Sequence, residues 1–448
     1  MTPIARVAGR QVTTLDGLPS AQAWAGAFAT HGASQCGFCT PGIIMRVAAL
    51  DPAARQSRAA VDRALAAHLC RCTGWNSVVD AVLSFGLDAS RPIPNDTSAE
   101  TRAALEGGCS QQVGPHVSLG RGGFADDTAP LDALIAVRSD DGEWVVGETL
   151  AGARRRAGKV QGRRSTAALT WPVPVPEGEW DRTLQTTWVE PGYLEPDASW
   201  CAPGGAPVTS LANGGAFGGK VASEVGDVAR RLADEHGRAV RVLYAREDVV
   251  RRGPKRPPLA AGLRGDGTGV VRVARTPGIV DAIGFIAPRL TVEEVDVAGP
   301  PTSAALRAGG WAEAAVLLAS LGSAPDGVVA PNGAAATASV GDGAVHVRVR
   351  CGHPLDEVVL RSYCTGAAHM ALGWVRSEGL AVDDAGVPLD LTIRSFGILR
   401  SSETPPVTVE IEADDGPPIN GSDAVFAAVA AAAWRHAGFP ARWPLAAH

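Results

Sequence analysis

The chain has 448 residues, a formal net charge of −6 at pH 7 and a pI near 5.9. This balance argues against a nucleic-acid-binding surface, and no apolar run reaches the roughly 20 residues that span a bilayer. The start of the chain lacks the basic-then-apolar layout of a secretion signal, so we expect a cytoplasmic protein. The length is sufficient for two to four domains, each with its own core.

Two cysteine pairs are the first informative feature along the chain. Cys36 and Cys39 form a C-x2-C pair, and Cys70 and Cys72 form a C-x-C pair. Two sulfide-bridged iron atoms need four thiolates, and both side chains of an extended C-x-C segment point to one face. Zinc also takes four thiolates, but usually from two C-x2-4-C knuckles, and a disulfide framework suits a short secreted chain better. An iron–sulfur cluster is therefore the favoured interpretation, ahead of zinc and of disulfides.

Helices are expected around these cysteines. Pro41 opens an apolar stretch, and Val61, Leu65 and Leu69 recur at helical spacing. A further helix is expected after Trp75, where valines follow at positions 78, 79 and 82.

The segments QCGFCTPG and LCRCTGW resemble the helical iron–sulfur domain of the xanthine dehydrogenase / aldehyde oxidase family, the molybdenum hydroxylases. The resemblance implies a small antiparallel helical bundle in which Cys36, Cys39, Cys70 and Cys72 bind one [2Fe–2S] cluster. The family carries a plant-type ferredoxin domain just before this one, and its C-x4-C-x2-C signature is absent here. The resemblance therefore implies that this domain lies on a separate chain or upstream of the present start.

The chain beyond the cysteines is expected to be mixed. A polar, proline-containing linker covers residues 91–98, strands are expected at 134–137 and 144–146, and a helix capped by Thr149 at 149–157. The alanine-rich stretch 427–433 is expected to form a buried C-terminal helix. The predicted fold class is α+β, with a helical-bundle [2Fe–2S] domain at 1–88, a linker and small α+β domain at 89–177, and a mixed α/β domain resembling a molybdopterin-binding domain at 178–448.

A glycine-rich loop is the second candidate site. By itself it predicts no more than a tight turn before a helix, or a loop that lets backbone amides approach an anion. Its sequence is similar to the GGGFGGK loop that contacts molybdopterin in the family, and Leu306–Gly310 is similar to the F-R-x-x-G stretch whose arginine reaches the cofactor. The cofactor-binding residues that this resemblance implies are Gly214, Gly215, Ala216, Phe217, Gly218, Gly219 and Arg307.

Several family positions are changed in this chain. Val189 and Met370 stand where the family has glutamines, and Gly416 stands where the family has its catalytic glutamate. That glutamate takes a proton from the attacking oxygen, which glycine cannot do. Asp414 or Asp415 would replace it only if the loop shifts, so no catalytic residue is assigned. The basic residues between 251 and 256 are expected to lie on a solvated loop.

Three functions are compatible with these features. The first is an oxidoreductase component of the xanthine dehydrogenase type, with a [2Fe–2S] cluster and molybdopterin. It would pass electrons from hydroxylation of a small heteroaromatic or aldehyde substrate to a flavin-binding (FAD) or plant-type ferredoxin subunit in a hetero-oligomer. The second is a non-catalytic electron-transfer and scaffold subunit that carries the cluster alone. The third, a redox sensor or assembly protein, is disfavoured because no DNA-binding helix pair or basic face is evident.

Overall fold

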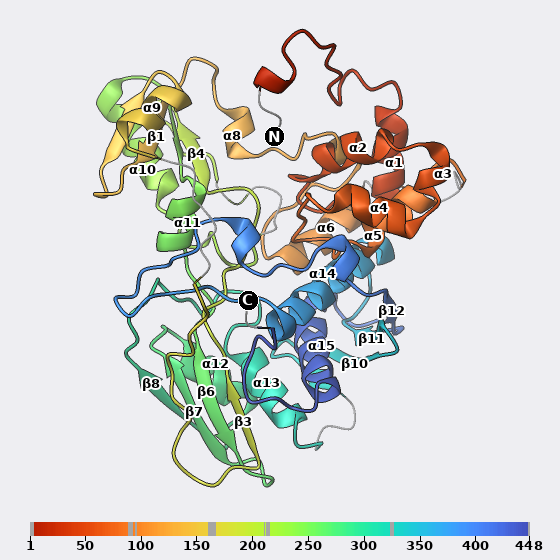
Figure 1. Ribbon diagram of the computed structural model, residues 1–448, viewed down its shortest axis with the longest axis vertical. Helices are drawn as coiled ribbons and strands as arrows, with labels where there is room; N and C mark the ends of the chain where they lie inside the picture. Colours follow the sequence, from red (N-terminus) through yellow and green to blue (C-terminus); the bar gives the residue numbers. More distant parts are fainter. Residues whose placement is uncertain are drawn as a thin grey trace.

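A computed structural model describes residues 4–87, 93–94, 96–159, 167–209, 211, 216–322 and 327–446 (Figure 1). The N-terminal part is helical, as expected. After a short 3-10 turn at Ile4–Arg6, its helices are α1 (Ala21–Thr30), α2 (Thr40–Ala48), α3 (Pro52–Arg55), α4 (Arg58–Leu65) and α5 (Asn76–Leu83). Pro41 stands in the first turn of α2, where its missing N–H costs no hydrogen bond. Trp24 and Phe28 on α1 are buried in the bundle, and Trp24 stacks on Phe85 at 3.6 Å between ring centroids.

A small mixed sheet follows the bundle. Three short helices come first: α6 (Thr97–Gly107), α7 (Pro115–Ser118) and α8 (Ala125–Thr128). The sheet has the order β2-β1-β5-β4, from the strands β1 (Leu134–Arg138), β2 (Trp144–Gly147), β4 (Ala198–Cys201) and β5 (Val240–Leu243). The helices beside it are α9 (Leu150–Arg156), capped by Thr149 as expected, α10 (Val225–His236) and α11 (Arg246–Arg252). Because β1 pairs with β5, strands from both sides of the expected boundary at residue 177 share one sheet. This sheet therefore spans the boundary expected at residue 177.

Two more four-stranded sheets complete the fold. One has the order β3-β6-β7-β8, from β3 (Arg182–Gln185), β6 (Leu259–Leu263), β7 (Gly269–Ala274) and β8 (Leu290–Val295). The other has the order β12-β11-β10-β9, from β9 (Val328–Val329), β10 (Ala335–Gly341), β11 (Ala344–Arg350) and β12 (Val407–Ile411). The helices of this half are α12 (Ile279–Ile286), α13 (Trp311–Ala319), α14 (Glu357–Arg376) and α15 (Ser422–His436), with 3-10 turns at Ile393–Ser395 and Ser401–Glu403.

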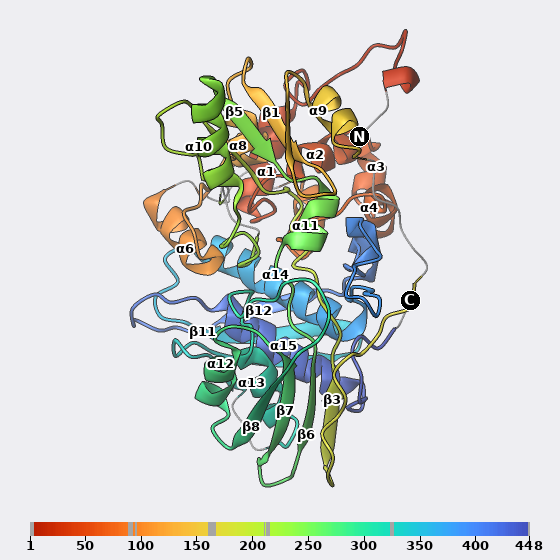
Figure 2. The ribbon, with the colours of Figure 1, turned by 90° about the vertical axis from the view of Figure 1, so that its left-hand side faces the viewer.

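Helix α14 is the central helix of the fold. Figures 1 and 2 both show it crossing the middle, between the N-terminal bundle and the two lower sheets. It packs against α15, where Trp374 stacks on Phe426 at 5.3 Å. The alanine-rich stretch 427–433 lies inside α15 and is buried, as expected, because small side chains let α15 approach its neighbours closely. No helix among the described residues is long and apolar enough to cross a membrane.

Candidate iron–sulfur site and cofactor cavity

The four predicted cluster cysteines come together at one end of the N-terminal bundle. Cys36 and Cys39 lie in the turn that leads into α2, and Cys70 and Cys72 lie in the loop between α4 and α5. Both turns depend on left-handed backbone, at Gly37 (φ +82°) and at Gly74 and Trp75 (φ 63° and 66°). A left-handed tryptophan is strained, and the buried Trp75 is held by a 3.2 Å hydrogen bond from Nε1 to the carbonyl of Leu399.

The sulfurs lie as two pairs, each with one thiol from each loop. The Sγ atoms of Cys36 and Cys72 are 3.6 Å apart, and the thiols of Cys39 and Cys70 are hydrogen-bonded to each other. Across the described ranges, no three or more histidine, cysteine, aspartate or glutamate side chains are grouped so that they could hold one metal ion. Two adjacent pairs of sulfurs suit two iron atoms, each held by two thiolates.

Cys36, Cys70 and Cys72 are buried and Cys39 is partly buried, and the four thiols influence one another's ionisation. The hydrogen bond from Cys39 lowers the pKa of Cys70 to about 6, with help from the Thr73 hydroxyl 3.1 Å away. The same hydrogen bond and burial raise the pKa of Cys39, and the hydrogen bond with Cys36 and burial raise the pKa of Cys72. Metal binding requires all four as thiolates, so a bound cluster would replace the protons that these hydrogen bonds hold.

The second cysteine loop is docked on α14. Gln35 donates to the carbonyl of Cys72 at 3.0 Å and to the hydroxyl of Ser362 at 3.0 Å. Gly366 faces the same carbonyl, and a β-carbon there would overlap the oxygen. The cluster loop is therefore packed directly against the central helix.

The structure brings the described part of the glycine-rich loop to Arg307. Gly214 and Gly215 lie outside the described residues, whereas 216–219 are described. The amide of Arg307 donates to the carbonyl of Phe217 at 3.0 Å, and its guanidinium lies 4.7 Å from the centre of the Phe217 ring. Phe217 and Ala308 both have left-handed backbone (φ 49° and 55°), a conformation that is costly without glycine and is concentrated at functional sites.

A cavity of 240 Å³ lies beside this loop; half of its lining residues are glycine, alanine or cysteine, and Glu106 and Asp423 also line it. Those small lining residues include Ala216, Gly218, Ala304, Ala305, Ala308 and Gly309. Arg307 reaches it but is already engaged: it donates to Asp423 at 3.0 Å and Ser422 at 2.8 Å, and lies 3.3 Å from the sulfur of Met370. Gly218 is required by packing, because a β-carbon there would overlap the Ala305 carbonyl. Glycine at 218 is therefore not by itself a sign of a bound anion.

Gly416, which the sequence resemblance aligns with the catalytic glutamate of the family, carries no carboxylate. Gly416 lies against Gly352, and its carbonyl accepts from the amide of His353 at 2.9 Å. Asp414 accepts from the amides of Gly416 at 2.8 Å and Gly352 at 3.2 Å, and these bonds lower its pKa. Asp415 is exposed. The loop is thus fixed with Asp414 committed to its own turn, and neither aspartate faces the cavity beside Arg307.

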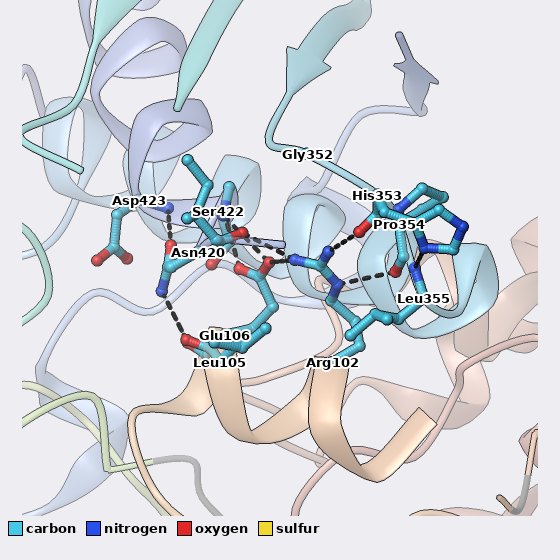
Figure 3. Close-up of polar contacts among 12 residues, drawn as sticks. Arg102, Leu105, Glu106, Gly352, His353, Pro354, Leu355, Asn420, Ser422 and Asp423 are labelled. Carbon is cyan, nitrogen blue, oxygen red and sulfur yellow. Dashed lines mark hydrogen bonds and ion pairs between the residues drawn. The ribbon is translucent and has the colours of Figure 1, made fainter. Parts of the chain in front are cut away.

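An unexpected buried ion pair fixes this region (Figure 3). Arg102 and Glu106 on α6 are both fully buried and 3.1 Å apart. Arg102 donates to the carbonyls of His353, Pro354 and Ile419. Glu106 accepts from the amides of Gly421 at 3.1 Å and Ser422 at 2.9 Å, at the start of α15. The positive end of that helix is therefore occupied by the chain's own carboxylate.

The basic segment at 251–256 is only partly solvated. Lys255 is fully buried and 2.9 Å from Glu190, and Arg256 is buried and 2.6 Å from Glu313. The expectation of a solvated loop was wrong for these two side chains. Each pairs with a glutamate distant in sequence, and that pairing offsets the cost of burying its charge.

Comparisons with known proteins by sequence find relatives for a small part of the chain. Residues 14–83 match the family described as the [2Fe–2S] binding domain. The xanthine dehydrogenase of Emericella nidulans is 41% identical over 91 residues, which are 19% of this chain and 6% of that protein. The xanthine dehydrogenase iron-sulfur-binding subunit of Escherichia coli O157:H7 is 40% identical over 84 residues, which are 17% of this chain and 51% of that subunit. The chain thus spans about half or less of these relatives.

The whole fold is similar to two solved structures. The aldehyde oxidoreductase from Desulfovibrio gigas gives a TM-score of 0.65 at 13% identity, covering 96% of this chain and 90% of that one. The enzyme from Desulfovibrio desulfuricans gives 0.63 at 12% identity, covering 94% and 89%. The [2Fe–2S] domain and its resemblance to xanthine dehydrogenases are therefore confirmed by sequence, and the α+β fold of the whole chain by structure.

Proposed function

We propose that this chain is an oxidoreductase component of the xanthine dehydrogenase type, with one [2Fe–2S] cluster and a molybdopterin site. Cys36, Cys39, Cys70 and Cys72 would hold the cluster as two pairs, Cys36 with Cys72 and Cys39 with Cys70. The observation that carries the proposal is the meeting of these two thiol pairs within the matched [2Fe–2S] domain.

The residues beside the 240 Å³ cavity fit part of a pterin site. Small residues let the backbone approach a flat ring system, and Arg307 supplies a positive charge at the wall. We assign Ala216, Phe217, Gly218, Gly219 and Arg307 to this site, together with the sequence-predicted Gly214 and Gly215. Molybdopterin, when bound, would supply the centre that takes two electrons from a small heteroaromatic or aldehyde substrate. Phe217 and Arg307 would orient it, and the cluster would receive the electrons.

Electrons would leave the cluster for a partner. We propose a hetero-oligomer in the cytoplasm, with a flavin-binding or plant-type ferredoxin subunit as acceptor. Two observations support this arrangement. One relative is itself described as an iron-sulfur-binding subunit, and the low cysteine content, eight in 448 residues, suits a reducing compartment.

A second candidate function is an electron-transfer and scaffold subunit with the cluster alone. Two features around Gly416 favour it. Glycine stands where the resemblance places the catalytic glutamate, and the carboxylate of Asp414 accepts hydrogen bonds from the amides of Gly416 and Gly352 in its own turn. The engagement of Arg307 by Asp423 and Ser422 also leaves it less available for an anionic cofactor.

Metal analysis decides between the two. Iron, acid-labile sulfide and molybdenum would be measured per chain, on protein isolated anaerobically with its native partners. About two iron atoms and two sulfides with stoichiometric molybdenum would support the enzyme component. The same iron and sulfide without molybdenum would support the scaffold subunit, and absence of both iron and sulfide would overturn both.

A further inference from the structure

One residue connects the cluster loop to the second candidate site. Arg71 lies between Cys70 and Cys72, and its side chain, 3% exposed, extends away from the bundle toward the larger part of the chain. Its two terminal nitrogens donate to the two carboxylate oxygens of Glu378 at 2.5 and 2.7 Å. Its Nε donates to the carbonyl of Pro191 at 2.9 Å. This fork-to-fork geometry is the strongest way to hold a guanidinium.

The end of α14 leaves room for the carboxylate of Glu378. Glu378 follows the end of α14, is 1% exposed, and has its amide bonded to the carbonyl of Gly373 at 2.7 Å. A side chain at Gly373 would overlap the Glu378 carboxylate, so the helix leaves the space open for it. The pair lines a water-sized cavity of 30 Å³ whose other walls include Phe217, Arg307 and Trp374. Arg71 therefore reaches the residues assigned to the second site.

The location of the charges matters for a redox centre. One-electron reduction of a cluster adds one negative charge, which a nearby positive charge stabilises. A unit charge within about 10 Å in a medium of effective dielectric constant near 20 changes such an equilibrium by roughly tenfold or more. Arg71 is adjacent in the chain to Cys70 and Cys72, and Glu378 contacts its guanidinium. The two charges are opposite in sign, so their separate removal should move the potential in opposite directions.

We propose that Arg71 is a positioning residue for electron transfer: its guanidinium, held by Glu378, raises the reduction potential of the cluster and ties the cluster loop to the wall of the second site. This inference rests on the cluster of the proposed function and not on molybdopterin.

The test is a redox titration of the full chain with its cluster, with dithionite as reductant and the reduced cluster followed by electron paramagnetic resonance at fixed pH. Arg71→Met removes the positive charge and is expected to lower the midpoint potential. A tenfold change in the reduced-to-oxidised ratio corresponds to about 59 mV for one electron. Glu378→Gln removes the negative charge and is expected to raise the potential. Arg71→Lys keeps the charge and is expected to stay near the unaltered value.

Opposite shifts from the two ends of one ion pair separate this role from a structural one. Arg102→Met provides the matched control, because Arg102 is equally buried and also paired with a glutamate but holds α6 instead of the cluster loop. It is expected to destabilise the chain while moving the potential less than Arg71→Met does. If Arg71→Met does not fold, Glu378→Gln and Arg71→Lys still test the sign.

Two failures are distinguishable. Absence of a cluster in the unaltered chain would overturn the proposed function, and this inference with it. A cluster whose potential is unmoved by both Arg71→Met and Glu378→Gln, or moved in the same direction by both, would overturn the role of Arg71 and leave the cluster assignment intact.

Discussion

Gly366 on α14 lies directly against the carbonyl oxygen of Cys72, so closely that a β-carbon on the glycine would overlap that oxygen. The carbonyl also accepts a hydrogen bond from Gln35 at 3.0 Å. The central helix therefore sets the position of the second cysteine loop, and a single methyl group at residue 366 has no room without moving the loop.

Gly366→Ala is expected to destabilise the chain by about 1–3 kcal/mol, the range for overpacking a filled core, and to speed the loss of iron. Denaturant unfolding and the rate of iron release to a chelator would measure the two effects. Gly284→Ala is the control, because Gly284 is also helical but has no atom within 4 Å of an added β-carbon. Equal behaviour of the two variants would contradict the docking of the Cys72 loop on α14.

Cys39→Ser is expected to weaken cluster binding strongly, because the serine hydroxyl stays protonated at neutral pH and is a much poorer ligand for iron than a thiolate. Iron and sulfide content, with the visible absorption of the cluster, would be measured on the purified chain. Cys109→Ser serves as control, since Cys109 lies outside both cluster loops and, like Cys39, is partly buried. Retention of two iron atoms by Cys39→Ser, or loss of iron by Cys109→Ser, would show that the ligand set is wrong.

The local parts of this fold could be predicted because their signals are local. The spacing of Cys36, Cys39, Cys70 and Cys72 and the apolar periodicity around them indicated a cluster in a helical bundle, and the structure forms that bundle with the sulfurs in two pairs. Thr149 was recognisable as a helix cap because capping depends on a residue and the amides that follow it. The proximity of Phe217 and Arg307 followed from family resemblance alone.

Contacts between distant segments could not be predicted in the same way. Arg102 and Glu106 stand four residues apart on a helix, which is the usual pattern of an exposed pair, and only the loops at 353–355 and 419–422 make them buried. Arg71 carried a signal, a charge between two cysteines, but its partner Glu378 is 307 residues away. The sheet that spans residue 177 is a third case, because the pairing of β1 with β5 joins residues more than a hundred positions apart.

Stability is expected to fall at acid pH because of His369. This side chain is fully buried, its Nε2 donates to the carbonyl of Leu399 at 3.0 Å, and burial lowers its pKa to about 4. The unfolded chain, with an ordinary pKa near 6.5, binds the proton more readily. The contribution of neutral His369 to the free energy of unfolding is therefore fully present above pH 6.5. It is lost progressively as the pH falls toward 4, by about 3 kcal/mol in all.

The measurement is the free energy of unfolding between pH 4 and 7.5 for the unaltered chain and for His369→Gln. Glutamine can still donate to Leu399 but does not titrate, so the difference between the two curves isolates the histidine. A difference that does not vary with pH would contradict the buried neutral imidazole.

The ion pair of Arg102 and Glu106 should matter far more than its spacing suggests. Arg102→Met leaves Glu106 as an uncompensated buried charge at the start of α15, which is expected to cost about 3–5 kcal/mol. Arg231 and Glu235 have the same four-residue separation on α10 but are each 59% exposed, so Arg231→Met is expected to cost less than about 0.5 kcal/mol. Denaturant unfolding of both variants gives the comparison.

Because Glu106 accepts hydrogen bonds from the amides of Gly421 and Ser422, Arg102→Met is also expected to lower the hydrogen-exchange protection of the first turn of α15. Unchanged protection there would show that Glu106 does not anchor the start of α15.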